Sequence, residues 1–337
     1  MKLLFLTSFF ASLLAFHPVQ AQITRAEAVS GSIFLKNIDE INEEDLNNQN
    51  KLRGRVRIER GDTMDLNTIS FGDDDKKKRS STKSAPEDTV KEEMIAIAEA
   101  EGYPFTNEAF VNASREGNLK AIAALLKAGM NINARNLFNE TALLAAVQKN
   151  QAETVAYLID QGVDVTARNG KGENALTIAA ARNYGGLFNM LIDAKVPMDV
   201  ADQDGRTPLH FAVSNENIPM ASILIVLGAD INRFNRYGST PLMIASWKGN
   251  KILAHRLIKA GAQVDAMDLN GNTPLILAVS YNKYDIAKLL LDEKANPNQT
   301  DRKGWPVIEL ALNSKFMDVA NLLLAYGARR PQILGTE

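Results

Sequence analysis

The chain repeats itself at a step of 33 residues, and this period restricts its fold more than any other feature of the sequence. One alanine recurs in seven successive units without insertion or deletion, at Ala113, Ala146, Ala179, Ala212, Ala245, Ala278 and Ala311. One leucine follows the same step, at Leu125, Leu158, Leu191, Leu224, Leu257, Leu290 and Leu323. A fixed period of this length predicts a solenoid, in which each unit buries its apolar face against its neighbours.

Short motifs inside the units resemble those of the ankyrin repeat family. Thr207-Pro208-Leu209-His210 stands where that family has its Thr-Pro-Leu-His start, and Thr240-Pro241-Leu242 and Thr273-Pro274-Leu275 repeat it. Leu227-Gly228-Ala229-Asp230-Ile231-Asn232 resembles the closing turn of that family. The resemblance covers about residues 104–329 and implies helix pairs joined by hairpins.

The same residue types have a local physical explanation. A threonine before a helix caps its free N–H groups, and a proline in the first turn loses no hydrogen bond. Gly228, Gly261 and Gly327 are expected to end the second helices in a left-handed conformation. The predicted fold class is therefore all-α, an ankyrin-type helical repeat solenoid of seven units that follows a signal peptide and a largely disordered tether.

The register divides the chain into consecutive segments. Three precede the array: a signal peptide (1–21), a tether of low order (22–88) and an N-terminal capping helix (89–103). The units that follow are numbered as repeats 1 to 7, at 104–136, 137–169, 170–202, 203–235, 236–268, 269–301 and 302–330. Residues 331–337 form a C-terminal tail.

Three repeats depart from the common pattern. In repeat 3, Asn174-Ala175 replaces Thr-Pro, Gly185-Gly186 interrupts the second helix, and Lys195-Val196-Pro197 replaces the closing turn. Glycine inside a helix costs about 0.5–1 kcal/mol, so we expect repeat 3 to be the least stable repeat and to let the array flex. Repeat 1 lacks Thr-Pro, and repeat 7 carries Trp305-Pro306-Val307. Atypical end repeats are expected, because each faces water on one side.

The first residues have the pattern of an export signal. Lys2 precedes a nearly continuous apolar run from Leu3 to Phe16, and Val19-Gln20-Ala21 offers small residues for cleavage after Ala21. Such a run is short for a membrane span, so no stable membrane insertion is expected after cleavage. The alternative is an uncleaved N-terminal anchor. Export and the absence of cysteine suit a bacterial periplasm, and secretion, including by a eukaryotic route, stays open.

The tether is charged and poor in apolar side chains from Gly72 to Glu93, so it cannot bury enough surface to fold alone. Arg55-Val56-Arg57-Ile58-Glu59 alternates like one short strand. Order is expected to return at Thr89, which with Glu92 fits a capping box before a helix that shields repeat 1.

No set of residues in the sequence predicts catalysis, a cofactor site or a metal site. The chain has no cysteine and three histidines, and no histidine or carboxylate cluster has metal-ligand spacing. His210 occupies the family's structural position, where it is expected to bond within the turn. The resemblance therefore implies a binding module rather than an enzyme.

In ankyrin-like arrays, partners typically contact the hairpin tips and the concave face of the first helices. Applied to this sequence, that geometry predicts a partner-binding set in repeats 5–7 made of Arg236, Tyr237, Trp247, Lys248, Tyr281, Arg302, Lys303 and Trp305. Both tryptophans of the chain fall in this set. Tryptophan, tyrosine and arginine dominate interface hot spots, although local packing against the next hairpin is the alternative explanation.

The charges at the equivalent positions of all repeats favour a mildly acidic protein partner. Nine are basic: Arg115, Lys149, Lys171, Arg182, Arg206, Arg236, Lys248, Arg302 and Lys303. Four are acidic: Glu116, Glu140, Glu173 and Asp204. The hairpin residues Asp202, Asp268 and Asp301 reduce this excess of basic over acidic residues. Nucleic acid is disfavoured because no continuous basic stripe exists. The chain alone is expected to be monomeric.

Three classes of function follow from these observations. The first is a periplasmic protein-binding module, and bacterial relatives of this type include stress-protection and immunity proteins. The second is a secreted effector that acts on host proteins, which its presence in host cytosol would support. The third is a small-molecule or enzymatic role, which only a ligand or activity screen could reveal.

Overall fold

Each repeat folds into an inner helix, an outer helix and a hairpin that leads to the next repeat. The computed structural model describes residues 86–330. The inner helices are α6 (Asn107–Glu116), α8 (Ala142–Gln148), α10 (Ala175–Ala181), α12 (Pro208–Ser214), α14 (Pro241–Lys248), α16 (Pro274–Ser280) and α18 (Val307–Asn313). The outer helices are α7 (Leu119–Lys127), α9 (Ala152–Asp160), α11 (Gly185–Asp193), α13 (Ile218–Val226), α15 (Lys251–Lys259), α17 (Tyr284–Asp292) and α19 (Met317–Ala325).

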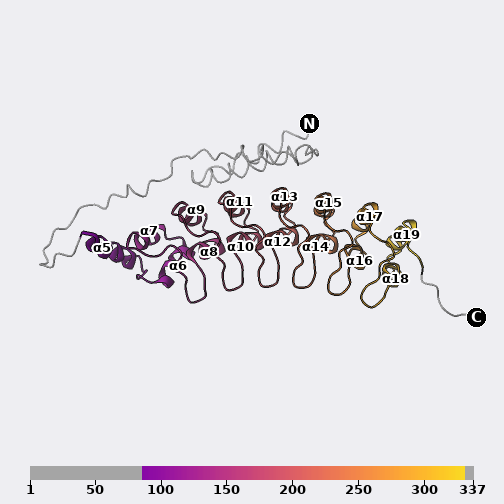
Figure 1. Ribbon diagram of the computed structural model, residues 1–337, viewed down its shortest axis with the longest axis horizontal. Coiled ribbons are helices and arrows are strands. Elements are labelled where there is room, and N and C mark those ends of the chain that lie inside the picture. Colours follow the sequence, from indigo (N-terminus) through magenta and orange to yellow (C-terminus); the bar gives the residue numbers. More distant parts are fainter. Residues whose placement is uncertain (1–85, 331–337) are drawn as a thin grey trace, which may run out of the picture. The chain divides into compact units, whose positions relative to one another are not determined.

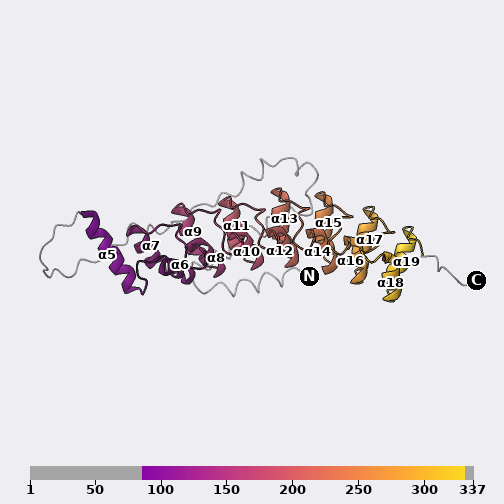
Figure 2. The ribbon, with the colours of Figure 1, turned by 60° about the horizontal axis from the view of Figure 1, so that its bottom comes forward.

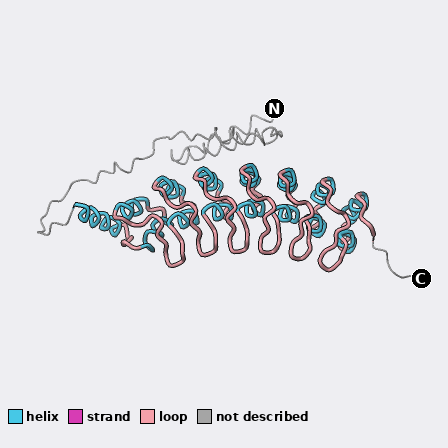
Figure 3. The backbone as a smooth tube through the Cα atoms, viewed as in Figure 1, coloured by secondary structure: helices cyan, strands magenta, loops and turns pink. Residues whose placement is uncertain are grey.

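The two kinds of helix form parallel rows, and the hairpins project on the side away from the outer helices (Figures 1 and 2). Each inner helix packs against the inner helices before and after it. In the outer row, α9 packs against α11, α13 against α15, and α17 against both α15 and α19. Figure 3 shows the long loops gathered along one edge of the array. This arrangement confirms the predicted all-α repeat solenoid.

The inner helices begin where the sequence places a capping side chain. Thr240 Oγ1 accepts a hydrogen bond from Met243 N at 3.3 Å, and Thr273 Oγ1 accepts one from Ile276 N at 3.2 Å. Repeat 1 lacks the Thr-Pro pair, yet Thr106 caps α6 through Ala109 N at 3.1 Å. The capping threonine therefore starts the helix without the proline.

The core lies between the two rows of helices and follows the repeat register. Every recurring alanine from Ala113 to Ala311 is fully buried, and so is every recurring leucine from Leu125 to Leu323. Small alanine side chains let neighbouring helices approach closely, while the leucines fill the space between the rows. These side chains belong to a single cluster that runs from Ala98 to Ala328, so the array buries one continuous core.

The first described helix, α5 (Pro86–Ala100), closes the N-terminal end of this core. It packs against α7 and buries Met94 and Ala98. The predicted capping helix was correct in kind but not in its first residue, because α5 begins at Pro86 and Thr89 lies inside its first turn. A proline is favourable there, since the first helical residues need no N–H partner.

Repeat 3 keeps the common backbone despite its unusual sequence. Asn174 replaces the capping threonine and accepts a hydrogen bond from Thr177 N at 2.8 Å. Helix α11 is continuous and begins at Gly185, so the predicted interruption of this helix is wrong. The glycine pair stands in the first turn, where the backbone N–H groups have no intrahelical partner. Lys195 takes the left-handed conformation, with φ 59°, that glycine takes elsewhere.

Several predictions fall on residues that the structure does not describe: the signal peptide, most of the tether with its short strand, and the C-terminal tail. They stay predictions. Within residues 86–330, no helix has the length and apolar character needed to cross a membrane.

Candidate functional site

Each hairpin is held by one polar side chain at its base. Asn235 Oδ1 accepts hydrogen bonds from Tyr237 N at 2.9 Å and from Ser239 N at 3.0 Å. Asp301 Oδ1 accepts from Lys303 N and Trp305 N, both at 2.9 Å. These turns fix the backbone of the tip, so the side chains at the tip project outward from a preformed loop.

Backbone hydrogen bonds join neighbouring hairpins side by side. Four run from one hairpin to the one before it: Gln203 N to Lys171 O (2.9 Å), Arg236 N to Asp204 O (2.8 Å), Leu269 N to Tyr237 O (3.2 Å) and Arg302 N to Asn270 O (3.1 Å). Gly238 permits this approach, because its φ is 74° and an added Cβ would lie 2.8 Å from Leu269 N. The hairpins therefore form one continuous, ordered edge.

The predicted partner-binding residues fall into two separate groups on this framework. The hairpin group consists of the exposed side chains Arg236, Tyr237, Arg302, Lys303 and Trp305. The second group, which we call the inner-helix group, consists of Trp247 and Lys248 at the end of α14 and Tyr281 directly after α16.

The inner-helix group is a compact aromatic and cationic cluster. The ring centroids of Trp247 and Tyr281 lie 5.9 Å apart with a tilt of 49°, and Lys248 Nζ lies 5.0 Å from the centre of the Trp247 ring. Trp247 remains 38% exposed and Tyr281 56% exposed. Glu216 pairs weakly with Lys248, at 3.9 Å. Each ring is therefore partly covered by the other ring, and the rest of its surface faces solvent.

Trp247 contacts a ring of the following repeat, whereas Trp305 stands on a hairpin. Among the described residues, the only aromatic ring contact is that of Trp247 with Tyr281. Trp305 and Tyr237 belong to the hairpins of their repeats instead, and Trp305 is 47% exposed there. These aromatic side chains are thus exposed at two kinds of position, the hairpins and the ends of the inner helices.

Arg236 is held in place by its neighbours. Its guanidinium contacts Asp204 Oδ1 at 2.6 Å and donates a hydrogen bond to the Tyr237 hydroxyl at 2.8 Å. That hydrogen bond, with Asp204 next in effect, raises the pKa of Arg236 further. Arg206 also pairs with Asp204, at 3.2 Å. Asp204 is therefore balanced by two arginines and adds little free negative charge to this edge.

Exposed apolar side chains that the predicted set omits also lie on hairpins. Leu137 and Phe138, at the tip in repeat 2, are 94% and 75% exposed. Phe234, Met267 and Leu269 are exposed on the hairpins of repeats 4 to 6. The repeat register places Leu137 and Phe138 at the positions of Arg236 and Tyr237, so this signal was present in the sequence.

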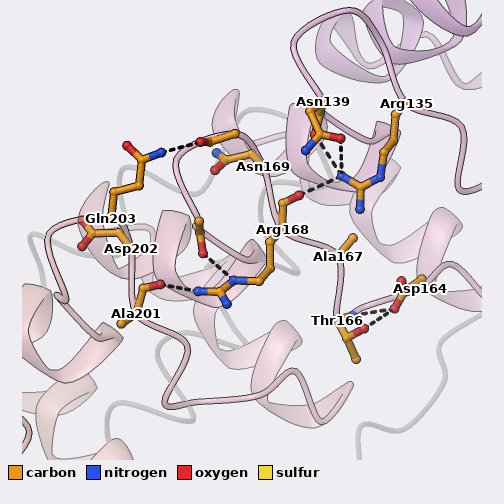
Figure 4. A pocket seen from close by; sticks show the side chains of 12 residues that line it. Arg135, Asn139, Asp164, Thr166, Ala167, Arg168, Asn169, Ala201, Asp202 and Gln203 are labelled. Atoms are coloured by element: carbon orange, nitrogen blue, oxygen red, sulfur yellow. Dashed lines mark hydrogen bonds between the residues drawn. The ribbon is translucent and has the colours of Figure 1, made fainter.

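A polar depression lies among the hairpins of repeats 2 to 4, but its arginines already have structural partners (Figure 4). Arg135 donates to Arg168 O at 2.8 Å and to Asn139 O at 3.0 Å. Arg168 donates to Gly172 O at 2.7 Å and to Ala201 O. Because these bonds tie each hairpin to the next, the two side chains serve the fold rather than a ligand.

The predicted structural role of His210 is confirmed. Its Nδ1 accepts a hydrogen bond from Thr207 N at 3.2 Å, and its Nε2 lies 3.2 Å from Ser239 O in the next repeat. Burial lowers the pKa of His210, so the ring is neutral and Nε2 donates to that carbonyl oxygen. Within residues 86–330, no group of three or more acidic or histidine side chains is placed to hold a metal ion.

Comparison with known proteins agrees with the fold and the register. The family model described as "Ankyrin repeats (3 copies)" matches residues 110–196, 176–268 and 252–332, about two thirds of the chain. The chain belongs to the ankyrin repeat family. Among solved structures, it is similar to the ankyrin repeat domain of Bcl-3, described as a unique member of the IkappaB protein family. The TM-score is 0.55 and the identity 23%, over 63% of this chain and 97% of that domain. No curated protein sequence shows significant similarity to the chain.

Membership of this family makes the array a protein–protein interaction module. The ankyrin repeat fold is typically a non-enzymatic scaffold, which agrees with the absence of a catalytic set from the sequence motifs.

Proposed function

We propose that the protein is exported and binds a partner protein through repeats 5–7, with the inner-helix group at the centre of the contact and the hairpin group beside it. The exposed ring pair of Trp247 and Tyr281 carries this proposal. Large aromatic side chains bury much area at a small entropic cost, and a second ring already restrains each of them.

The charges around the ring pair support a partner surface with acidic residues. Lys248 lies over the Trp247 ring, and exposed Arg236, Arg302 and Lys303 stand on the hairpins. Opposite charge speeds association and selects the partner more than it adds to affinity. The association rate should therefore fall as the salt concentration rises.

Cross-linked affinity purification from the native cell tests the site. The test variant is Trp247→Ala/Tyr281→Ala, and the matched control is Ile252→Ala/Tyr284→Ala, which removes exposed side chains from outer helices of the same repeats. We expect the test variant to weaken binding of the enriched partner by roughly 30-fold or more, the size of a hot-spot loss, and the control to retain it. Retention by both variants, with unchanged helical signal, would place the site elsewhere.

Export rests on the apolar run from Leu3 to Phe16 and on the small residues before Gln22. Cell fractionation and N-terminal sequencing of the mature protein test it. A mature chain that starts at Gln22 outside the cytoplasm is the expected result, while a full-length cytoplasmic chain contradicts it.

A further inference from the structure

The outer margin of the hairpins has an unusual composition for a surface that faces water. Five large side chains with apolar character are exposed at the tips or directly beside them: Leu137, Phe138, Tyr237, Leu269 and Trp305. Leu137 and Phe138 are neighbours on one tip, while the other three stand on successive hairpins of repeats 5 to 7. We refer to the tips of all these hairpins, from repeat 2 to repeat 7, as the hairpin edge.

Cations accompany the apolar side chains along the hairpin edge. Four exposed basic residues occupy tip positions: Lys171, Arg236, Arg302 and Lys303. The acidic residues at the tips or directly beside them are Glu140, Glu173 and Asp204. Glu140 is buried and pairs with Arg115, and Asn169 donates a hydrogen bond to Glu173. Asp204 is paired with Arg206 and Arg236. These four cations are exposed although the chain as a whole carries a formal net charge of −2.

The aspartates at the bases of the hairpins face the backbone of their own turns. Asp268 Oδ1 accepts from Asn270 N and Asn272 N, both at 2.8 Å. Asp202 Oδ1 accepts from Asp204 N at 2.9 Å, and Asp301 makes the equivalent bonds already described. A carboxylate bound by N–H groups at the base of a turn is screened from a ligand at the tip. The three aspartates are therefore engaged within their turns, while Lys171, Arg302 and Lys303 are exposed at the tips.

We propose that the hairpin edge docks on an anionic lipid membrane surface. Leucine, phenylalanine, tyrosine and tryptophan beside lysine and arginine match what the interface of a charged bilayer accepts, because rings and aliphatic groups enter the headgroup region and cations pair with lipid phosphates. Docking of this kind is peripheral and needs no membrane-spanning helix.

The shape of the edge favours a membrane over a protein as the ligand of the tips. Leu137 and Phe138 project almost completely from the repeat 2 hairpin, while the other apolar tips lie in repeats 5 to 7. A protein interface needs pockets that match such projecting side chains, whereas a lipid interface accepts them at several separate points. Backbone bonds between adjacent hairpins hold the tips of repeats 3 to 7 in one row, which suits an extended surface.

This inference goes beyond the proposed protein binding and shares only the hairpin group with it. Where both hold, the hairpin group lies at the lipid surface, and the inner-helix group binds the protein partner. The two proposals can fail separately, because Trp247→Ala/Tyr281→Ala leaves the hairpin edge intact.

The two tryptophans provide the test, because the chain has no others. In full-length Trp247→Phe protein, Trp305 is the sole tryptophan and reports the edge; in Trp305→Phe protein, Trp247 reports the inner helices. Vesicles contain equal parts of phosphatidylglycerol and phosphatidylcholine brominated on its acyl chains. We expect the emission of Trp305 to shift to shorter wavelength and to be quenched, and that of Trp247 to change little. The N-terminal apolar segment has no tryptophan, so its own binding to lipid cannot imitate this result.

Affinity measurements with the same lipids without bromine sharpen the test. We expect Arg302→Gln/Lys303→Gln to weaken vesicle binding roughly 30-fold, since each cation near an anionic surface contributes about 1 kcal/mol. Leu137→Ser/Phe138→Ser should weaken it about tenfold. The control Ile252→Ser/Tyr284→Ser, on the outer helices, should bind as the wild type does.

Three results would overturn the inference. The first is equal quenching of Trp305 and Trp247 by the brominated lipid, or quenching of neither. The second is equal binding to vesicles of phosphatidylcholine alone, which would remove the role of charge. The third is loss of a cross-linked protein, without loss of vesicle binding, in Leu137→Ser/Phe138→Ser, which would make the tips a protein-binding surface. Loss of partner capture in Trp247→Ala/Tyr281→Ala with unchanged vesicle binding supports both proposals.

Discussion

Repeat 4 begins its inner helix with Thr207 and Pro208, whereas repeat 3 begins its inner helix with Asn174 and Ala175. In repeat 4 the His210 ring completes the cap and reaches Ser239 O in the following repeat. In repeat 3 the oxygen of the Asn174 amide caps α10, and its nitrogen donates to Pro197 O of the same repeat at 2.8 Å.

The outer helices of these two repeats differ as well. Asn217 caps α13 through Met220 N at 2.9 Å, while Tyr184 before α11 makes no side-chain cap. Gly228 lies in the turn after α13 with φ 87°, and Lys195 adopts φ 59° at the same position after α11. Repeat 3 thus adopts the same backbone as repeat 4 with fewer favourable capping and turn residues. This shows that stacking of the core governs the fold. We expect repeat 3 to open before repeat 4.

The largest expected effects come from the core, where the two repeats are equivalent. Leu191 and Leu224 are both fully buried at the same register position. Replacement of either by alanine should cost about 2–5 kcal/mol of unfolding free energy. If repeat 3 is the weaker one, urea unfolding of Leu191→Ala should separate into two transitions, while that of Leu224→Ala stays closer to one. Equal, single transitions in both variants would contradict a weak repeat 3.

The cap of repeat 3 should matter more than the cap of repeat 4. Asn174→Ala removes a cap and leaves Pro197 O without its amide donor, so we expect a loss of about 1–3 kcal/mol. Thr207→Ala should cost about 1 kcal/mol, because the proline remains in the first turn. Thermal melting monitored by circular dichroism measures both. Asn174→Thr is the control, since it restores a cap without the amide bond and should fall between wild type and alanine.

Acid should weaken repeat 4 through His210. Because burial lowers the pKa of His210 in the folded state, the unfolded chain binds the proton first as the pH falls below about 6.5. The stability that neutral His210 provides is complete above that pH and is lost toward the lower folded pKa, by at most about 1.4 kcal/mol per pH unit. Subtracting the stability of His210→Asn from that of wild type across this range isolates the effect. A flat difference would show that the ring does not titrate on unfolding.

Much of this architecture follows from the sequence because the repeat register is a physical constraint. Every recurring alanine and leucine lies in the core, and Gly228, Gly261 and Gly327 all have positive φ as expected. Burial and backbone chirality act at fixed positions of each repeat, so a one-dimensional pattern is sufficient to predict them.

The arrangement of the binding surface was harder to predict. The register treats Tyr237 and Trp247 as members of one set, but most of α14 lies between them. At 1.5 Å per residue, a helix of eight residues separates its ends by about 10 Å, so Trp247 pairs with Tyr281 and Tyr237 stays on the hairpin. Similarly, the charge of Asp202 or Asp301 can be counted in the sequence, whereas its use inside a turn requires the structure.

The smallest expected effect tests the closing turns directly. A lysine at positive φ is strained because its Cβ crowds the backbone, and glycine relieves this. We expect Lys195→Gly to stabilise the protein by about 0.5–1 kcal/mol, and the reverse change Gly228→Lys in repeat 4 to destabilise it by a similar amount. Hydrogen exchange resolved by repeat should show the gain in repeat 3 and the loss in repeat 4. If protection of repeat 3 does not rise in Lys195→Gly, the closing turn is not the origin of its weakness, and the uncapped start of α11 becomes the remaining local difference.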